Sequence, residues 1–249
     1  FELFSLSFNK FFEKGFLKAQ MNRSSNDQVY DDSNASFPVF SEHNLEYTSF
    51  GLIGKQLISK SLNYEASFHQ KTERVDSSDL NKRELKTTSL SVTGNYVNLK
   101  NDYKISPSLR FDSREENEKS TFNLGFEALN QLNQTNSSFD FNLDIGSSFQ
   151  FPTMNDLFWP DGLYSGGNPE LRPEESEYLA LALSNQSSLG KIKLTASFKD
   201  YRDLIVWQPN EDFKYIPKNV SSAERTSYNI QYLKEFSNFQ MQLSYNVFE

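Results

Sequence analysis

Cysteine is absent from the chain, so disulfide bonds, thiolate metal ligands and a cysteine nucleophile are all excluded. Apolar runs are short, and none approaches the roughly 18 residues that a membrane-spanning helix requires. The only two histidines, His43 and His69, have no partner at ligand spacing, and the sequence contains no glycine-rich phosphate loop or nucleophile elbow. These absences predict that the protein is not an enzyme.

Basic residues are also too few to give the chain a positive net charge. The chain has 25 Lys and Arg residues against 33 Asp and Glu, which gives a formal net charge of -8. Nucleic-acid-binding surfaces are basic, so this balance argues against DNA or RNA as a partner. Glycine and proline are modest at 10 and 8, whereas phenylalanine and tyrosine are abundant at 23 and 12.

The abundant apolar residues follow a period of two. From Phe139 to Phe151 they occupy alternate positions, while Asp140, Asn142 and Asp144 take the positions between them. This pattern indicates a strand with one apolar and one polar face. Twelve segments of this kind are expected, most of them near ten residues, which matches the roughly 9–11 residues of a tilted membrane strand. The predicted fold class is therefore all-β, an antiparallel up-and-down transmembrane β-barrel.

The connections between these segments are expected to alternate strictly between short turns and long loops. Outer-membrane barrels have short periplasmic turns and longer outer loops, so all the long loops would lie outside the cell. One strand carries Pro107, which cannot donate to a ladder, and we expect a bulge or local defect there. The predicted long loops are 24–43, 75–86, 113–119, 152–173 and 208–222.

Three motifs in the second half of the chain carry a family resemblance. They are Phe149-Gln-Phe-Pro-Thr-Met-Asn-Asp-Leu-Phe-Trp-Pro160, Gly167-Asn-Pro-Glu-Leu-Arg-Pro-Glu-Glu-Ser176 and Arg202-Asp-Leu-Ile205. In this order and spacing the chain resembles the barrel of TonB-dependent outer-membrane receptors. Gln150 departs from the pattern, where the family commonly has arginine or lysine. The residues that match the motifs are Pro152, Thr153, Asp156, Leu157, Asn168, Pro169, Leu171, Pro173, Glu174, Asp203, Leu204 and Ile205.

The resemblance implies a receptor in the cell outer membrane that imports a scarce ligand by TonB-dependent active transport. Residues 1–249 would be one partial barrel domain, with twelve of about 22 strands, truncated at both ends. Its partners would be outer-membrane lipid, a plug domain that is missing here, the inner-membrane TonB energy-transducing complex and a small ligand. Cobalamin or a ferric siderophore is the favoured cargo, and haem belongs to the same range. Polar residues of the long strand would contact the plug, namely Asn142, Asp144, Ser148 and Gln150.

The loop 152–173 has two interpretations. In the first, its prolines and glycines stiffen and bend the chain, and the motif residues, including Asp203-Leu204-Ile205, are architectural. In the second, Phe158, Trp159 and Tyr164 present aromatic surface to a ligand, because rigid aromatic side chains lose little entropy on binding. We favour the first for the motif residues and keep ligand contact open for Trp159 and Tyr164.

Several alternatives remain open. The sequence predicts no cofactor. The carboxylates of Asp27, Asp31 and Asp32 in an expected outer loop could bind calcium, but they lack regular EF-hand spacing. Calcium is retained only because the resemblance implies it, since cobalamin-type receptors order outer loops with calcium. A passive porin-like channel would explain the strand periodicity but not the three motifs. A soluble β-rich binding module would need a sheet covered on both faces, which the polar alternate positions disfavour.

Overall fold

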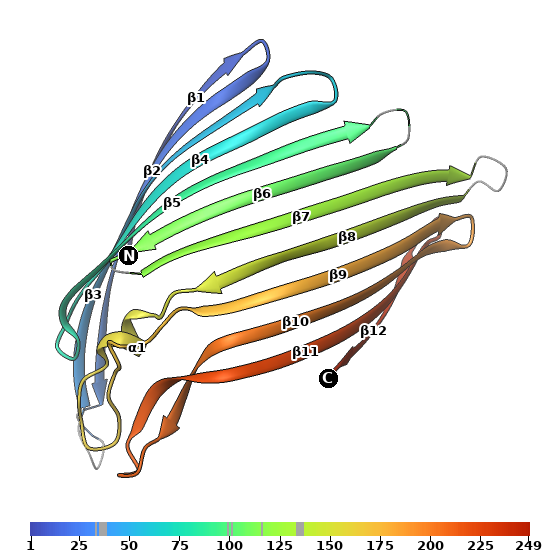
Figure 1. Ribbon diagram of the computed structural model, residues 1–249. Helices are drawn as coiled ribbons and strands as arrows, with labels where there is room; N and C mark the ends of the chain where they lie inside the picture. The colour runs from blue at the N-terminus through green and yellow to red at the C-terminus, as the bar shows by residue number, and fades with distance from the viewer. Residues whose placement is uncertain (33, 35–38, 99, 101, 116, 133–136) are drawn as a thin grey trace.

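The computed structural model describes every residue except 33, 35–38, 99, 101, 116 and 133–136. Twelve strands in the described part form a single antiparallel sheet in which each strand pairs with its neighbours in the chain, from β1 at one edge to β12 at the other. The sheet curves like a section of barrel wall and does not close (Figure 1). This arrangement confirms the prediction of an all-β, partial up-and-down barrel.

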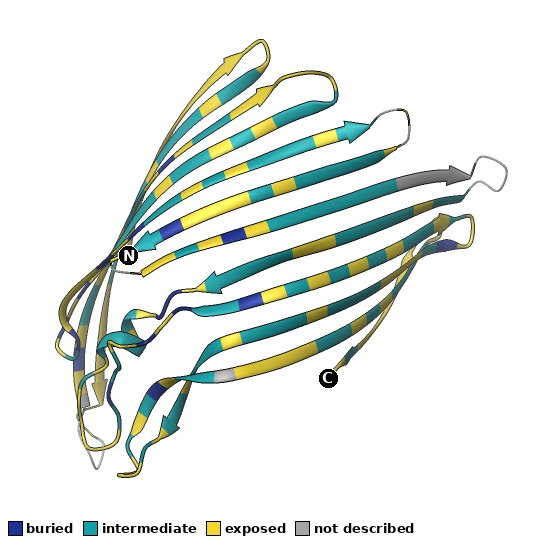
Figure 2. Ribbon diagram, viewed as in Figure 1, coloured by how far each residue is buried: buried dark blue, intermediate teal, exposed yellow. Residues whose placement is uncertain are grey.

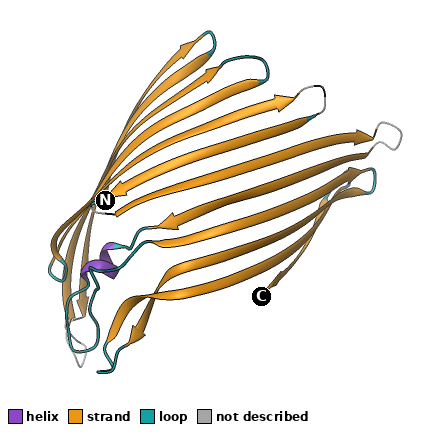
Figure 3. Cartoon of the chain, viewed as in Figure 1, coloured by secondary structure: helices purple, strands orange, loops and turns teal. Residues whose placement is uncertain are grey.

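The strands are long, and one short helix interrupts the longest connection (Figure 3). No helix among the described residues is long and apolar enough to cross a membrane. The elements are β1 (Glu2–Phe12), β2 (Gly15–Asp32), β3 (Val39–Leu57), β4 (Leu62–Ser77), β5 (Asn81–Asn98), β6 (Tyr103–Arg114), β7 (Asn117–Leu132), β8 (Ser137–Gln150), α1 (Met154–Phe158), β9 (Glu174–Ser187), β10 (Gly190–Pro209), β11 (Tyr215–Glu235) and β12 (Gln240–Phe248).

Register places one kind of side chain on each face of the sheet. Ile145 of β8 lies opposite Leu124 of β7 and Leu179 of β9, and the side chains of this apolar row are partly exposed. On the other face, which we call the polar face, hydroxyl and amide groups pair across neighbouring strands. The cross-strand hydrogen bonds of that face include Asn22–Ser49, Ser67–Ser91, Asn95–Ser106, Ser148–Ser176 and Ser197–Ser227.

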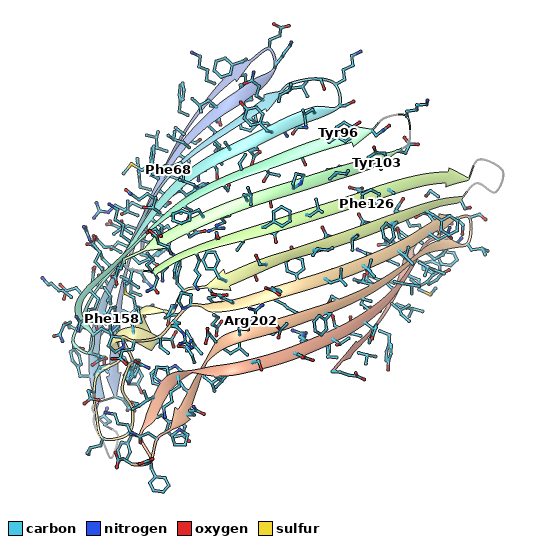
Figure 4. The ribbon with its side chains drawn as sticks, viewed as in Figure 1. Phe68, Tyr96, Tyr103, Phe126, Phe158 and Arg202 are labelled. Atoms are coloured by element: carbon cyan, nitrogen blue, oxygen red, sulfur yellow. The ribbon has the colours of Figure 1, made fainter. Side chains whose placement is uncertain are left out.

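Aromatic rings line the apolar face near the end of β5 at Asn98 and the start of β6 at Tyr103, and they continue onto β7 and β8. Tyr96, Tyr103 and Phe126 lie side by side on consecutive strands, with ring centroids 6.2 and 6.0 Å apart, and Phe141 continues the row at 6.1 Å (Figure 4). Aromatic rows at the border of an apolar face are typical of the interfacial girdle of membrane barrels.

The apolar face has a sharp limit at its other end. Phe68, Leu90 and Phe111 form one apolar row across β4, β5 and β6. Further along the same face of β4 and β5, Arg74 pairs with Glu84 at 2.5 Å. The strands therefore continue beyond the apolar band as paired arms that are polar on this face.

Because of these arms, the predicted bounds of several long loops are wrong. Residues 24–32, 39–43 and 81–86 belong to strands, as do 113–114, 117–119, 208–209 and 215–222, so the strict alternation of short and long connections is wrong. The physical reason is that strand segments beyond the apolar band lose their apolar–polar alternation but keep their backbone pairing. Among the described connections between the strands, 151–173 alone is a long loop. The predicted loops also contain residues outside the described part, namely 33, 35–38 and 116.

Pro107 has the predicted local effect without a bulge. The β5–β6 ladder stops at Thr93–Ser108 and resumes at Tyr96–Ile105 in unchanged register. On its other side Pro107 still lies opposite Leu124 of β7. The proline therefore interrupts one ladder and shifts neither strand, because only its missing N–H is lost from the pairing.

Buried apolar residues are few and concentrated away from the middle of the sheet (Figure 2). The buried large hydrophobics among the described residues are Val75, Leu80, Leu85, Phe151 and Leu171. They belong to the arms of β4 and β5, to the turn between these strands and to the loop 151–173. The packed part of the molecule is thus where this loop meets the sheet.

Candidate functional site at the loop 151–173

The loop begins with a helical capping box, which the alternation of apolar and polar residues in the strands does not predict. Thr153 is the N-cap of α1 and its hydroxyl accepts from the backbone N–H of Asp156 at 3.2 Å. The Asp156 carboxylate accepts in return from the Thr153 backbone N–H at 2.9 Å and from its hydroxyl at 2.6 Å. The spacing Thr-x-x-Asp is the signal that could have predicted this helix.

Asp156 also ties the helix to the sheet. Its second carboxylate oxygen accepts from Nε1 of Trp207 on β10 at 2.9 Å. Trp207 in turn meets Trp159 edge to face, with ring centroids 6.4 Å apart. One carboxylate therefore holds both the start of the loop and its position against β10.

The second motif fixes the middle of the loop. The backbone N–H of Asn168 donates to the Asp156 carbonyl at 2.7 Å, and its side-chain amide donates to the carbonyl of Pro217 on β11 at 3.1 Å. Gly167 lies so close to the helix end that a Cβ there would be 2.6 Å from the Trp159 nitrogen. Only glycine permits this approach.

The third motif contacts the end of the loop. Asp203 has a positive φ of 56° and its carboxylate accepts from the Arg172 guanidinium at 2.5 Å. Asn219 of β11 donates to the carbonyls of Arg172 and Asp203 at 2.9 and 2.6 Å. The Glu174 carboxylate accepts from the backbone N–H of Ile205 at 2.7 Å. Motifs far apart in the sequence are thereby joined in space.

The remaining motif residues lie around these contacts. Pro152, Leu171 and Pro173 are buried, whereas Pro169 is exposed in a turn. Leu157 and Leu204 are half-buried, and Leu204 lies opposite Val220 on β11.

Arg114 anchors the loop to the polar face of the sheet. Its guanidinium donates to Thr87 Oγ1 at 2.8 Å and to the Pro152 carbonyl at 3.1 Å, and it lies 4.7 Å from the Phe151 ring centroid. It also forms an ion pair with Glu73 at 3.4 Å. Burial of this side chain lowers the pKa of Arg114 from its ordinary value, although the nearby carboxylates oppose the shift.

A cavity of about 790 Å³, lined by both polar and apolar side chains, lies between the start of the loop and the polar face of β2–β6. Asp112 on its floor is 1% exposed and accepts from Arg110 at 2.6 and 2.8 Å and from the Ser89 hydroxyl. Lys71 and His69 also line it. Because its walls offer charged, hydroxyl and imidazole groups, the cavity is suited to a polar occupant.

The three aromatic ligand candidates do not converge. Phe158 lies 4.8 Å beneath the Arg83 guanidinium, and Trp159 donates its indole N–H to Ser165 at 3.0 Å (Figure 4 labels Phe158). Tyr164, by contrast, is 80% exposed at the tip of the loop.

Sequence reasoning missed the neighbours of Tyr164. The backbone N–H of Tyr215 donates to the Tyr164 carbonyl at 2.8 Å, which joins the loop tip to the β10–β11 turn. Leu163 and Phe213 are 86% and 84% exposed at these two tips. Their apolar character within polar segments was the available signal, and only the structure shows that the two tips meet.

The candidate calcium residues do not form a cluster. Asp27, Asp31 and Asp32 lie on β2 rather than in a loop, and Asp32 takes the opposite face from the other two. Asp27 accepts from the Asn44 side chain at 2.5 Å. Within the described residues no group of three acidic, histidine or cysteine side chains could hold a metal ion.

The two histidines have structural partners. His43 Nδ1 lies 2.7 Å from the Ser77 hydroxyl and its Nε2 lies 3.6 Å from Asp79. Ser77 is buried and its hydroxyl also accepts from two backbone N–H groups of the following turn. This Ser–His–Asp proximity therefore caps the β4–β5 turn. His69 packs over Gly51, where a Cβ would be 2.7 Å from its ring.

Together these features define a section of β-barrel wall with one apolar face and a structured loop locked onto its polar face. The chain belongs to the family of TonB dependent receptor-like β-barrels, whose sequence pattern matches residues 3–247. That family comprises receptors, in agreement with the resemblance of the three motifs.

Individual proteins of known sequence agree with this assignment. The chain is 33% identical over 127 residues to the vitamin B12 transporter BtuB of Photobacterium profundum, covering 49% of this chain and 20% of that protein. It is 31% identical over 97 residues to the vitamin B12 transporter BtuB of Vibrio vulnificus strain YJ016, covering 39% and 15%. The aligned regions are thus a fifth or less of these two relatives.

Solved structures show the same fold at low sequence identity. The siderophore receptor PirA of Pseudomonas aeruginosa superposes with a TM-score of 0.81 at 16% identity, over 99% of this chain and 49% of that one. The copper transporter OprC superposes with a TM-score of 0.74 at 13% identity, over 99% and 46%. The chain therefore spans about half the length of these two proteins.

Proposed function

We propose that this chain forms part of the wall of an outer-membrane receptor, with its apolar face against lipid. The aromatic row of Tyr96, Tyr103 and Phe126 supports this placement at one border of the apolar band. The Arg74–Glu84 pair supports it at the other border, because such ion pairs belong in water. Outer-membrane barrels extend further outside the cell than into the periplasm, so the arms and the loop 151–173 would face outward.

The function that the geometry supports best is TonB-dependent import of a scarce ligand. The observation that carries this proposal is the interlocking of the three motifs, in which Asp156, Arg172 and Glu174 hold the loop on β10. Cobalamin ranks first among the ligands, since the two relatives compared in sequence are vitamin B12 transporters. A ferric siderophore ranks next, since the fold is that of a siderophore receptor.

The first contact with the ligand is assigned to the joined tips of the loop and the β10–β11 turn. Leu163, Tyr164 and Phe213 expose most of their surface there. The polar face would meet the plug domain of the complete receptor. Its candidate residues on β8 are Asn142, Asp144, Ser148 and Gln150, of which Ser148 already bonds Ser176 at 2.7 Å.

Uptake by the complete receptor tests the proposal. A strain that lacks its own cobalamin receptor should take up radiolabelled cyanocobalamin when it expresses the complete gene, and only when its TonB complex is functional. Tyr164→Ala should weaken binding several-fold, while Tyr30→Ala, which removes an exposed tyrosine from the β2 arm, should not.

Other outcomes have distinct meanings. Saturable, TonB-dependent uptake of a ferric siderophore instead of cyanocobalamin would correct the cargo and retain the receptor. Non-saturable passage of unrelated small solutes without TonB would identify a porin-like channel and refute active transport.

A further inference from the structure

Two connected grooves cross the apolar face of β1–β6. One, of about 680 Å³, is lined by apolar side chains of β3–β6 that include Leu52, Phe68 and Leu109 (Figure 4 labels Phe68). The other, of about 600 Å³, continues toward the β1–β2 turn and includes Phe12 and Leu17. Gly54 and Ala66 line both grooves, so the two form one channel along the sheet surface.

The channel is apolar over most of its length and basic at one end. Lys14 of the β1–β2 turn lines the second groove. Lys10 lies in the same cross-strand row as Leu17 and Gly54, and its ammonium group is 5.5 Å from the Phe12 ring centroid. Neither lysine forms an ion pair within the described part of the chain, so both charges are available to an external anion.

We propose that this channel is a binding site for one anionic phospholipid. An acyl chain would lie in the apolar groove over Gly54 and Ala66, and the phosphate would lie at Lys10 and Lys14. An amphiphile with a negative head group matches both ends of the channel, whereas a zwitterionic lipid gains little net attraction at the lysines. The inference rests on the proposed membrane location and adds a lipid preference to it.

Native mass spectrometry of the complete receptor, titrated in detergent with phosphatidylglycerol or phosphatidylcholine, tests the site. The wild type should retain phosphatidylglycerol more tightly. Each lysine near a membrane surface contributes about 1 kcal/mol toward an anionic head group, so Lys10→Gln with Lys14→Gln should reduce this affinity roughly 25-fold. Lys18→Gln is the matched control, because Lys18 also forms no ion pair within the described residues but lies on the polar face of β2.

A larger side chain in the groove tests whether an acyl chain lies there. Ala66→Leu should lower the retention of both lipids, whereas Ala196→Leu, which adds the same bulk to the apolar face of β10, should leave it unchanged. Equal retention of the two lipids by the wild type would overturn the proposal, as would equal losses in the test and control variants. A receptor that fractionates away from the outer membrane would instead contradict the membrane location itself.

Discussion

Removal of the Asp156 side chain should release the loop 151–173 from the sheet. In Asp156→Ala the indole N–H of Trp207 loses its acceptor, and an unsatisfied, partly buried donor costs about 1–3 kcal/mol. The capping box also loses the carboxylate that accepts from the Thr153 backbone N–H, which adds roughly 0.5–1 kcal/mol. A loss of about 1.5–4 kcal/mol in the local opening free energy of the loop is the expected sum.

Amide hydrogen exchange of the complete receptor measures this quantity directly. Peptides from the loop should exchange roughly 10- to 900-fold faster in Asp156→Ala, while the peptides of β6 and β7 keep their protection. Asp161→Ala is the control within the same loop. Asp161 pairs with Lys214 but its side chain is 88% exposed, so its loss should change exchange by no more than about fivefold.

The result that refutes this reasoning is equal acceleration in the two variants. It would mean that the capping box and the Trp207 bond do not hold the loop. A Trp207→Phe variant provides an independent check, because its effect should not add to that of Asp156→Ala if the two side chains act through one hydrogen bond.

Three further predictions concern the same region. Gly167→Ala should destabilise the loop by at least about 2 kcal/mol, since its Cβ would meet backbone at 2.6 Å, whereas Gly162→Ala, with its nearest atom at 3.7 Å, should be neutral in the same exchange measurement. Arg114→Lys should lower protection at the start of the loop by about 1–3 kcal/mol, because an ammonium group cannot serve Thr87, Pro152 and the Phe151 ring together. Phe213→Ala should leave the melting temperature unchanged but weaken ligand binding several-fold by calorimetry; an unchanged Kd would remove Phe213 from the contact surface.

The faces of the strands could be predicted from sequence, but their ends could not. Within the apolar band a slip of one residue would exchange apolar and polar faces, so the period of two is strict, as at Phe139–Phe151. Beyond the band that constraint disappears. Segments such as 81–86 consequently resembled loops, although ion pairs such as Arg74–Glu84 accompany a regular ladder.

The candidate site was predictable in its residues but not in its contacts. The sequence motifs pointed to Asp156, Glu174 and Asp203, and the structure shows each in a specific hydrogen bond or ion pair. Which partners they meet depends on the register of β9, β10 and β11. Trp207 and Asn219 could therefore be assigned to the site only from the structure, since neither spacing nor composition connects them to the loop.

The interlocked motifs also explain how a long loop can serve as a binding surface. Ordering a loop costs about 1–2 kcal/mol of backbone entropy per residue, a cost that falls on the ligand if the loop is disordered before binding. Here the contacts of Asp156, Asn168 and Arg172 with β10 and β11 offset that cost within the protein. In the proposed receptor, the exposed side chains of Tyr164 and Phe213 would meet a ligand from a preorganised backbone. The motifs would therefore contribute to affinity without touching the ligand, which is why their substitution should weaken binding in proportion to the loss of loop protection.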